Sequence, residues 1–221
     1  TLMRPSPSIM TLAGLRSRCT SGERASARET SARVAAGAIA RSFLRELGIE
    51  IGSHVVAIGP VRAETRGDTQ PDLNRRSDAS DVRCIDDQAA ERMRSAIAEA
   101  AAAGDTLGGQ FEVVARGVPV GLGSHVSWDR RIDARIGAAM LSIQAMKGVE
   151  IGLGFEAAGL PGSRVHDEIS VDPTSRRTGG FRRSRNSAGG LEGGMTTGEP
   201  LVVRVAMKPL SSLSRPLGSV D

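Results

Sequence analysis

Three segments of this 221-residue chain combine cations, hydroxyls and glycines in patterns suited to binding an anion. Arg24-Ala25-Ser26 leads into a predicted helix, whose free backbone N–H groups and positive dipole end favour negative charge. Residues 189–198 form a glycine-dense stretch that lets the backbone approach a flat ligand closely. Lys208-Pro209-Leu210-Ser211-Ser212 ends a predicted strand with an ammonium group and two hydroxyls, which suit a phosphate or a pyrimidine edge. Together they predict a basic, glycine-lined site for a planar anionic ligand.

A fourth segment imitates a dinucleotide-binding motif. Gly152-Leu153-Gly154-Phe155-Glu156-Ala157 matches the GxGxxA pattern after a predicted strand, and Asp172 lies twenty residues after Gly152. That motif needs a helix directly behind it to hold the pyrophosphate. Because Gly159, Pro161 and Gly162 forbid such a helix, we reject the dinucleotide interpretation.

Other polar groups have plainer interpretations. Residues 164–168 hold an Arg, a His and two acids, but their spacing matches no metal-ligand motif, so we expect a hydrogen-bonded loop and no metal site. His54 and His125 lie in or beside apolar strands and are interpreted as structural histidines. The two cysteines form no CxxC motif, which argues against a zinc finger and a disulfide scaffold.

Charge and hydropathy narrow the class of partner. The net charge of +4 suits anionic partners, and the one dense basic stretch is the arginine loop 176–185. RNA binding by stacking would need aromatic residues in that loop beyond Phe181, so RNA binding is kept only as a weak alternative. No run of 18 apolar residues and no signal peptide is present, so we expect a cytoplasmic protein that does not span a membrane.

The elements that must position these segments follow from hydrophobic periodicity. Ser26 and Glu29 form a capping box for a helix over 26–47, with Gly48 as its stop. Its apolar stripe is formed by Ala35, Ile39, Phe43 and Leu47. Residues 1–22 lack a period and are predicted to be a loop segment separate from a domain over 23–221.

The rest of the chain alternates strands and helices. Strands are predicted at 49–59, 110–116, 149–153 and 201–207, with Glu112 on the polar side of the second. A helix begins after Asp86 and ends at Gly104, and another begins after Asp129 and ends at Lys147-Gly148. Residues 60–85 read as a polar surface loop. The pattern favours one α+β domain with antiparallel sheets packed on helices.

At these same residues the sequence resembles the chorismate synthases. The resemblance covers roughly residues 23–59 and 104–221. It is carried, in the family's order, by ERASARETSARVAAGAIA, GDTLGGQFEVVARGVPVGLGS, AAMLSIQAMKGVEIGLGF, GSRVHDEI, AGGLEGGMTTGEPL and VAMKPLSS. So many long stretches in order make the resemblance highly specific.

The resemblance implies a fold, a cofactor and a reaction. The fold is a β-α-β sandwich with helices between antiparallel sheets, assembled as a homotetramer. The reaction converts 5-enolpyruvylshikimate 3-phosphate to chorismate and phosphate with reduced FMN, as the last step of the shikimate pathway. The substrate contact that carries over is Arg28. The flavin contacts that carry over are Arg24, Ala25, Ser26, Gln144, Ala145, Gly193, Lys208, Pro209, Leu210, Ser211 and Ser212.

The departures from the family pattern concern catalysis. The family's N-terminal Gly-Glu-Ser-His-Gly motif has no counterpart here, and Ile9 in Pro7-Ser8-Ile9-Met10-Thr11 stands where its second catalytic histidine is expected. A further arginine and a catalytic aspartate of the family are expected beyond Asp221. We therefore expect an internal fragment that carries most flavin contacts but no catalytic residue. The alternative is a non-catalytic flavin- or anion-binding remnant of the same fold.

Overall fold

The chain folds around one antiparallel sheet of five strands. The computed structural model describes residues 21–176, 178–211, 213 and 218. The strand order is β2-β1-β3-β9-β4, and every neighbouring pair is antiparallel. The strands are β1 (Glu50–Ile58), β2 (Val61–Arg62), β3 (Gly109–Arg116), β4 (Met146–Ile151) and β9 (Leu201–Met207). This arrangement, with its helices, confirms the predicted α+β class.

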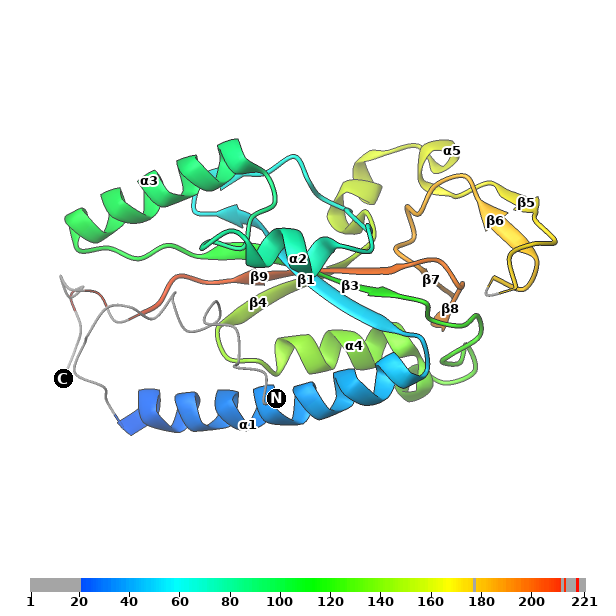
Figure 1. Cartoon of the computed structure of the whole chain (residues 1–221), viewed down its shortest axis with the longest axis horizontal. Coiled ribbons are helices and arrows are strands. Elements are labelled where there is room, and N and C mark those ends of the chain that lie inside the picture. Colours follow the sequence, from blue (N-terminus) through cyan, green and yellow to red (C-terminus); the bar gives the residue numbers. More distant parts are fainter. Residues whose placement is uncertain (1–20, 177, 212, 214–217, 219–221) are drawn as a thin grey trace.

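Helices cover both faces of the sheet. Figure 1 shows α1 (Ser21–Glu46) and α4 (Ile132–Leu141) on one face, and α2 (Leu73–Asp78) and α3 (Asp87–Ala103) on the other. On the α3 face, Ala89, Ala90 and Met93 pack with Ile58 in one buried cluster. On the α1 and α4 face, a second cluster joins Ile49, Val118, Leu191 and Leu201 to side chains of both helices. Each face thus has its own small core.

The shorter elements gather at one end of the molecule. The hairpin β5 (Ile169–Val171) and β6 (Phe181–Arg183) and the hairpin β7 (Leu191–Glu192) and β8 (Met195–Thr196) lie together there (Figure 1). Three short helices complete the connections: η3 (Trp128–Arg130), η4 (Gly154–Gly159) and α5 (Gly162–Val165). The six-residue η4 ends at Gly159, which agrees with the rejection of a dinucleotide motif.

Several sequence predictions are confirmed closely. The predicted strands at 49–59, 110–116 and 201–207 correspond to β1, β3 and β9. Asp86 caps α3, since its Oδ1 accepts the Ala89 N–H at 2.9 Å, and Gly104 ends the helix with φ 73. The left-handed Gly48, at φ 72, ends α1 as expected.

The predicted start and burial of α1 are wrong. The helix begins at Ser21, so Ser26 lies in its second turn and cannot be its N-cap. Glu29 forms an ion pair with Arg33 one turn later instead of closing a capping box. The predicted stripe faces solvent: Ile39 is 74% exposed and Phe43 is 64% exposed. Only the neighbouring Leu44 reaches the core.

Three further predictions need correction. Residues 60–85 are not simply a surface loop, because they hold β2 and α2, and Leu73 of α2 is buried. Asp129 does not cap α4; it lies in η3, and the residue at the α4 N-cap is Arg131. Lys147 and Gly148 belong to β4, beside a register shift, rather than to the end of a helix. In the last case the pairing of β4 with β9 outweighs the local signal.

Some predictions fall outside the described residues. The segment 1–20, which includes Ile9, and Ser212 are among the residues whose structure is not described. The division into a segment 1–22 and a domain 23–221 therefore stays a prediction. Among the described residues, no helix is both long enough and apolar enough to cross a membrane.

Candidate functional site

The largest group of predicted flavin contacts meets where β9 and β4 lie side by side. The Lys208 N–H donates to the Ala145 carbonyl at 3.0 Å, and the adjacent Met207 pairs with Met146. Gln144 and Ala145 are brought to this point by α4, which ends three residues before Gln144. Residues more than sixty positions apart in the sequence thus form one junction.

The backbone of this junction is held in an uncommon conformation. Ala145 has φ 68, and apart from glycines it shares a positive φ only with Arg83 among the described residues. A residue with a side chain is rarely found there, and such positions cluster at ligand sites. The conformation turns the chain from α4 into β4 while the Ala145 carbonyl faces Lys208.

The backbone of the segment that follows β9 is held by residues 106–108, and its side chains are exposed. A side chain at Gly108 would lie 2.5 Å from the Met207 carbonyl oxygen and 3.0 Å from Pro209, so only glycine fits beneath the segment. The Thr106 hydroxyl donates to the Leu210 carbonyl at 2.7 Å. The side chains of Lys208, Leu210 and Ser211 stay exposed. Fixed backbone with exposed polar side chains is an arrangement that can bind an anionic ligand.

The beginning of α1 lies at this same end of the molecule (Figure 1). Arg24, Ala25 and Ser26 are in its first two turns, near the positive end of the helix dipole. Arg28 lies one turn beyond Arg24, and its side chain is exposed. These four residues therefore lie at the end of the molecule that also holds the Lys208 junction.

Gly193 is not brought to that junction. With Gly194 it forms the turn between β7 and β8, and the two have φ 57 and 84, as in a type I′ hairpin turn. The Gly194 carbonyl accepts the Ile132 N–H at 3.0 Å, at the beginning of α4, whereas Gln144 and Ala145 follow its end. Figure 1 shows this hairpin at the opposite end of the sheet from the C-terminal end of β9, which Lys208 follows.

A network of charged side chains crosses the centre of the sheet. His54, Glu112, Arg204 and Glu150 lie directly opposite one another on β1, β3, β9 and β4. His54 Nε2 lies 3.2 Å from the Glu112 carboxylate. Arg204 donates two hydrogen bonds to Glu112, one from Nη2 at 2.7 Å and one from Nε at 3.0 Å. The Nη1 group of Arg204 donates to Glu150 at 2.7 Å. The side chains of His54 and Glu112 have no exposed surface. The network therefore joins four strands in low-dielectric surroundings.

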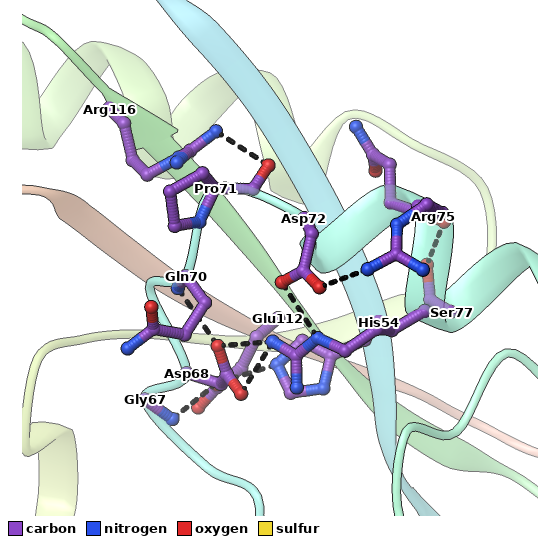
Figure 2. A network of polar contacts seen from close by, with 12 residues as sticks. His54, Gly67, Asp68, Gln70, Pro71, Asp72, Arg75, Ser77, Glu112 and Arg116 are labelled. Atoms are coloured by element: carbon purple, nitrogen blue, oxygen red, sulfur yellow. Dashed lines mark hydrogen bonds and ion pairs between the residues drawn. The ribbon is translucent and has the colours of Figure 1, made fainter.

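The same network binds the segment that leads to α2. The Gly67 N–H donates to Glu112 at 2.7 Å, and Figure 2 shows Gly67, His54 and Glu112 together beside Asp68. Burial by itself raises the pKa of the Glu112 carboxyl, but hydrogen bonds from His54, Gly67 and Arg204 outweigh it and hold that pKa below its usual range. Glu112 thus stays ionised and fixes both sheet and segment.

A second pair extends this segment. Asp68 accepts two hydrogen bonds of 2.8 Å from Arg76 of α2. Burial by itself raises the pKa of the Asp68 carboxyl. The Arg76 guanidinium and the Gln70 N–H lower that pKa by more than burial raises it, so the pKa lies below its ordinary value. Because these groups bind one another, the arrangement acts to position α2 rather than to do chemistry.

Sequence reasoning missed this network. Alternation along 110–116 predicts Glu112 on the polar side, but Glu112 and Val114 are buried while Phe111 and Val113 are only half-buried. His54 is confirmed as a structural histidine, whereas His125 is exposed. The signal lay in opposite charges at matching positions of strands that pair, and it can be read only once the strand order is known.

The expected hydrogen-bonded loop at 164–168 is also confirmed. Asp167 accepts the N–H groups of Ser187 and Ala188 at 3.1 and 3.3 Å, and Arg185 donates to the carbonyls of Arg164 and His166. The described residues contain no group of His, Cys, Asp and Glu side chains arranged to hold a metal ion. The cluster therefore connects two loops of the protein.

Two hollows lie away from the Lys208 junction. One, of about 510 Å³, is lined by arginines of which Arg183 is paired with Glu192 and Arg204 with Glu112. The other, of about 540 Å³, lies beside the β7–β8 turn and is lined by Gly123, Ser124, Asp129, Arg130 and Arg135. Neither coincides with the Lys208 junction.

Comparison with known proteins decides the family. The family model described as chorismate synthase matches residues 4–221. The chain belongs to the chorismate synthase family. It is 54% identical over 202 residues to the chorismate synthase of Geobacter sulfurreducens and 57% identical over 199 residues to that of Moorella thermoacetica. These alignments cover 90% of this chain but only 51% and 50% of the relatives, so the chain spans about half their length.

The fold agrees with this assignment. A crystal structure titled as chorismate synthase superposes with a TM-score of 0.78 at 52% identity, covering 85% of this chain and 57% of that one. A match of this quality confirms the predicted fold of the chorismate synthase type. Within the described residues, the helices pack on a single large sheet.

Proposed function

We propose that this chain supplies the flavin-binding part of a chorismate synthase. The reaction is the 1,4-anti elimination of phosphate from 5-enolpyruvylshikimate 3-phosphate to give chorismate, with reduced FMN as cofactor. The observation that carries the proposal is the Lys208–Ala145 junction, which unites two of the family's flavin-contact segments in one exposed, rigid corner. Family membership and the match over residues 4–221 support the reaction class.

The residues of this corner fit an anionic, planar ligand. The Lys208 ammonium and the Ser211 hydroxyl would hold polar edges or phosphate oxygens, and Arg24 and Ser26 would add a helix start that favours negative charge. Reduced FMN, when bound, supplies electron density to the breaking C–O bond. The protein binds and orients the two ligands, and Arg28 is the candidate contact for the substrate.

Calorimetry under anaerobic conditions tests the cofactor site. The chain should bind reduced FMN, and Lys208→Ala should weaken binding by about 10- to 100-fold because a hydrogen bond to a charged group is lost. Arg92→Ala is the matched control, since Arg92 is an exposed cation on α3, on the other face of the sheet. Unchanged affinity in Lys208→Ala would remove Lys208 from the site.

We propose further that these 221 residues alone do not turn over substrate. None of them matches the family's catalytic motifs, Ile9 stands in place of a histidine, and positioned acid-base groups contribute about 10²–10⁴-fold each. No chorismate should form in an anaerobic assay of phosphate release and chorismate absorbance, even after Ile9→His. Turnover at the rate of a full-length relative would contradict this.

The substitution at Ile9 also favours the second candidate, a non-catalytic flavin- or anion-binding remnant that assembles with other copies. RNA binding is not supported, because Arg183 and Arg185 in the arginine loop are bound to Glu192 and to backbone carbonyls of the chain itself. We place the protein in the cytoplasm as a homo-oligomer, a tetramer by analogy with the family, without nucleic acid or membrane partners.

A further inference from the structure

An arginine ties the first half of α1 to the end of α4. Arg33 Nη1 donates to the Ser142 hydroxyl at 3.0 Å, and Arg33 Nη2 donates to the Ser142 carbonyl at 3.3 Å. Ser142 is the C-cap residue of α4, so the guanidinium meets the negative end of that helix dipole. Glu29, one turn earlier on α1, forms an ion pair with the same guanidinium. The contact therefore joins two helices through positions 109 residues apart in the sequence.

The second half of α1 is attached to the sheet by different residues. Arg41 Nη2 donates to the Ile51 carbonyl of β1 at 3.1 Å, and Leu44 packs in the core on this face. Arg33 and Arg41 are eight positions apart, and the side chains of both are exposed. Two similar arginines thus fix the two halves of one helix, the first half to α4 and the second half to β1.

Both sides of the Arg33 contact lead towards the proposed cofactor site. On α1, position 26 lies on the same helical face as Arg33, two turns or about 10 Å nearer the beginning of the helix. On the other side, Ala145 follows Ser142 by three residues, and its carbonyl accepts the Lys208 N–H at 3.0 Å. The contact between Arg33 and Ser142 therefore lies between the start of α1 and the Lys208 junction.

We propose that Arg33 is a positioning residue, which holds the start of α1 at the distance and rotation that the cofactor site requires. A ligand that contacts two elements is bound well only if both elements are held to within about 0.5 Å of the productive geometry. Arg33 meets this need through Ser142 and the end of α4, and not by contact with the ligand. The inference rests on the proposed flavin site, because it concerns the spacing between two parts of that site.

Two matched variants separate positioning from stability. Arg33→Met keeps an unbranched side chain and removes the contact with Ser142, and Arg41→Met does the same to the contact with Ile51. Urea denaturation should show similar and small losses of unfolding free energy in the two variants. Anaerobic calorimetry should show that reduced FMN binds about tenfold more weakly to Arg33→Met and less than about twofold more weakly to Arg41→Met. The circular dichroism of the bound flavin should change in Arg33→Met alone.

A third variant tests the route through Ser142. Ser142→Ala removes the hydroxyl that accepts from Arg33 but leaves the carbonyl, so it should weaken binding of reduced FMN by a smaller factor than Arg33→Met does. In the double variant the loss of affinity should be smaller than the product of the two separate losses, because part of the shared contact is removed twice. A loss equal to that product would show that the two residues act independently and would overturn the inference.

The outcomes distinguish this inference from the cofactor proposal. If the original chain does not bind reduced FMN, the proposed cofactor site fails and the role of Arg33 fails with it. If the original chain binds but Arg33→Met binds equally well, or Arg41→Met is weakened as much, the cofactor site stands and the positioning role is wrong. A large loss of stability confined to Arg33→Met would assign Arg33 to folding and would overturn the positioning role as well.

Discussion

Replacing Glu112 by alanine should destabilise the fold far more than the loss of an exposed carboxylate. Its side chain is fully buried and accepts hydrogen bonds from Arg204, His54 and the Gly67 N–H. The substitution leaves the Arg204 guanidinium, only 7% exposed, with Glu150 as its remaining acidic partner. Breaking a buried ion pair in this way costs about 3–5 kcal/mol of unfolding free energy. For a chain of this size the melting temperature should fall by roughly 6–20 °C.

Urea denaturation followed by circular dichroism measures this loss. Glu156→Ala is the matched control, because Glu156 is 54% exposed and lies 3.8 Å from Arg66 in a surface ion pair. That change should alter the unfolding free energy by less than about 0.5 kcal/mol. A cost for Glu112→Ala below about 1 kcal/mol, or equal to that of Glu156→Ala, would refute the view that the network stabilises the sheet.

The pH dependence provides a second check on the same group. The pKa of Glu112 is lower in the folded protein than its ordinary value, so the unfolded chain binds the proton more readily. The stabilisation by Glu112 is therefore present above the ordinary carboxyl pKa of about 4.3 and is lost as the pH falls through the lower folded pKa. Glu112→Ala should flatten this part of the stability curve. An identical acid slope in both proteins would contradict the assignment.

Two smaller effects follow from the helix ends and faces. Asp86→Ala should cost about 1 kcal/mol of unfolding free energy because α3 loses its N-cap. Asp87→Ala, which changes the next residue and removes no capping bond, should cost less. Equal losses of unfolding free energy in a urea titration would contradict the cap. Phe43→Ser should reduce binding of a dye specific for apolar surface with little loss of stability, whereas Leu44→Ser should destabilise the fold, since Phe43 is exposed and Leu44 packs in the core. A larger stability loss in Phe43→Ser than in Leu44→Ser would reverse the assigned faces.

Local signals predicted the elements of this fold well. The cap at Asp86, the stop at Gly104 and the strand at 201–207 were each predicted from residues within one element, and each is confirmed. The burial in that strand does not alternate, because residues 201–205 are all buried. The start of α1 and the cap of α4 were predicted wrongly because Ser26 and Asp129 have the right residue type without the right position. A residue type that favours caps therefore does not by itself locate the end of a helix, because the same type also occurs inside helices and in the turns before them.

Long-range arrangement could not be predicted in the same way. Glu112 is placed correctly in a strand by alternation but on the wrong side, because burial of a carboxylate depends on Arg204 and His54 from strands distant in sequence. α2 was missed because its residues are polar, and it is held by Asn74, whose amide donates to the Ile51 carbonyl and whose oxygen accepts the Ser53 N–H. Both errors concern groups whose partners are known only after folding.

The exposed stripe on α1 shows what periodicity does and does not report. Ile39 and Phe43 recur at helical spacing, as a face that becomes buried does, yet both face solvent in the described part of the chain. Leu44, next to Phe43 in the sequence, packs in the core instead. Apolar spacing therefore predicts the helix and its apolar face, but whether that face is buried depends on a surface outside the helix.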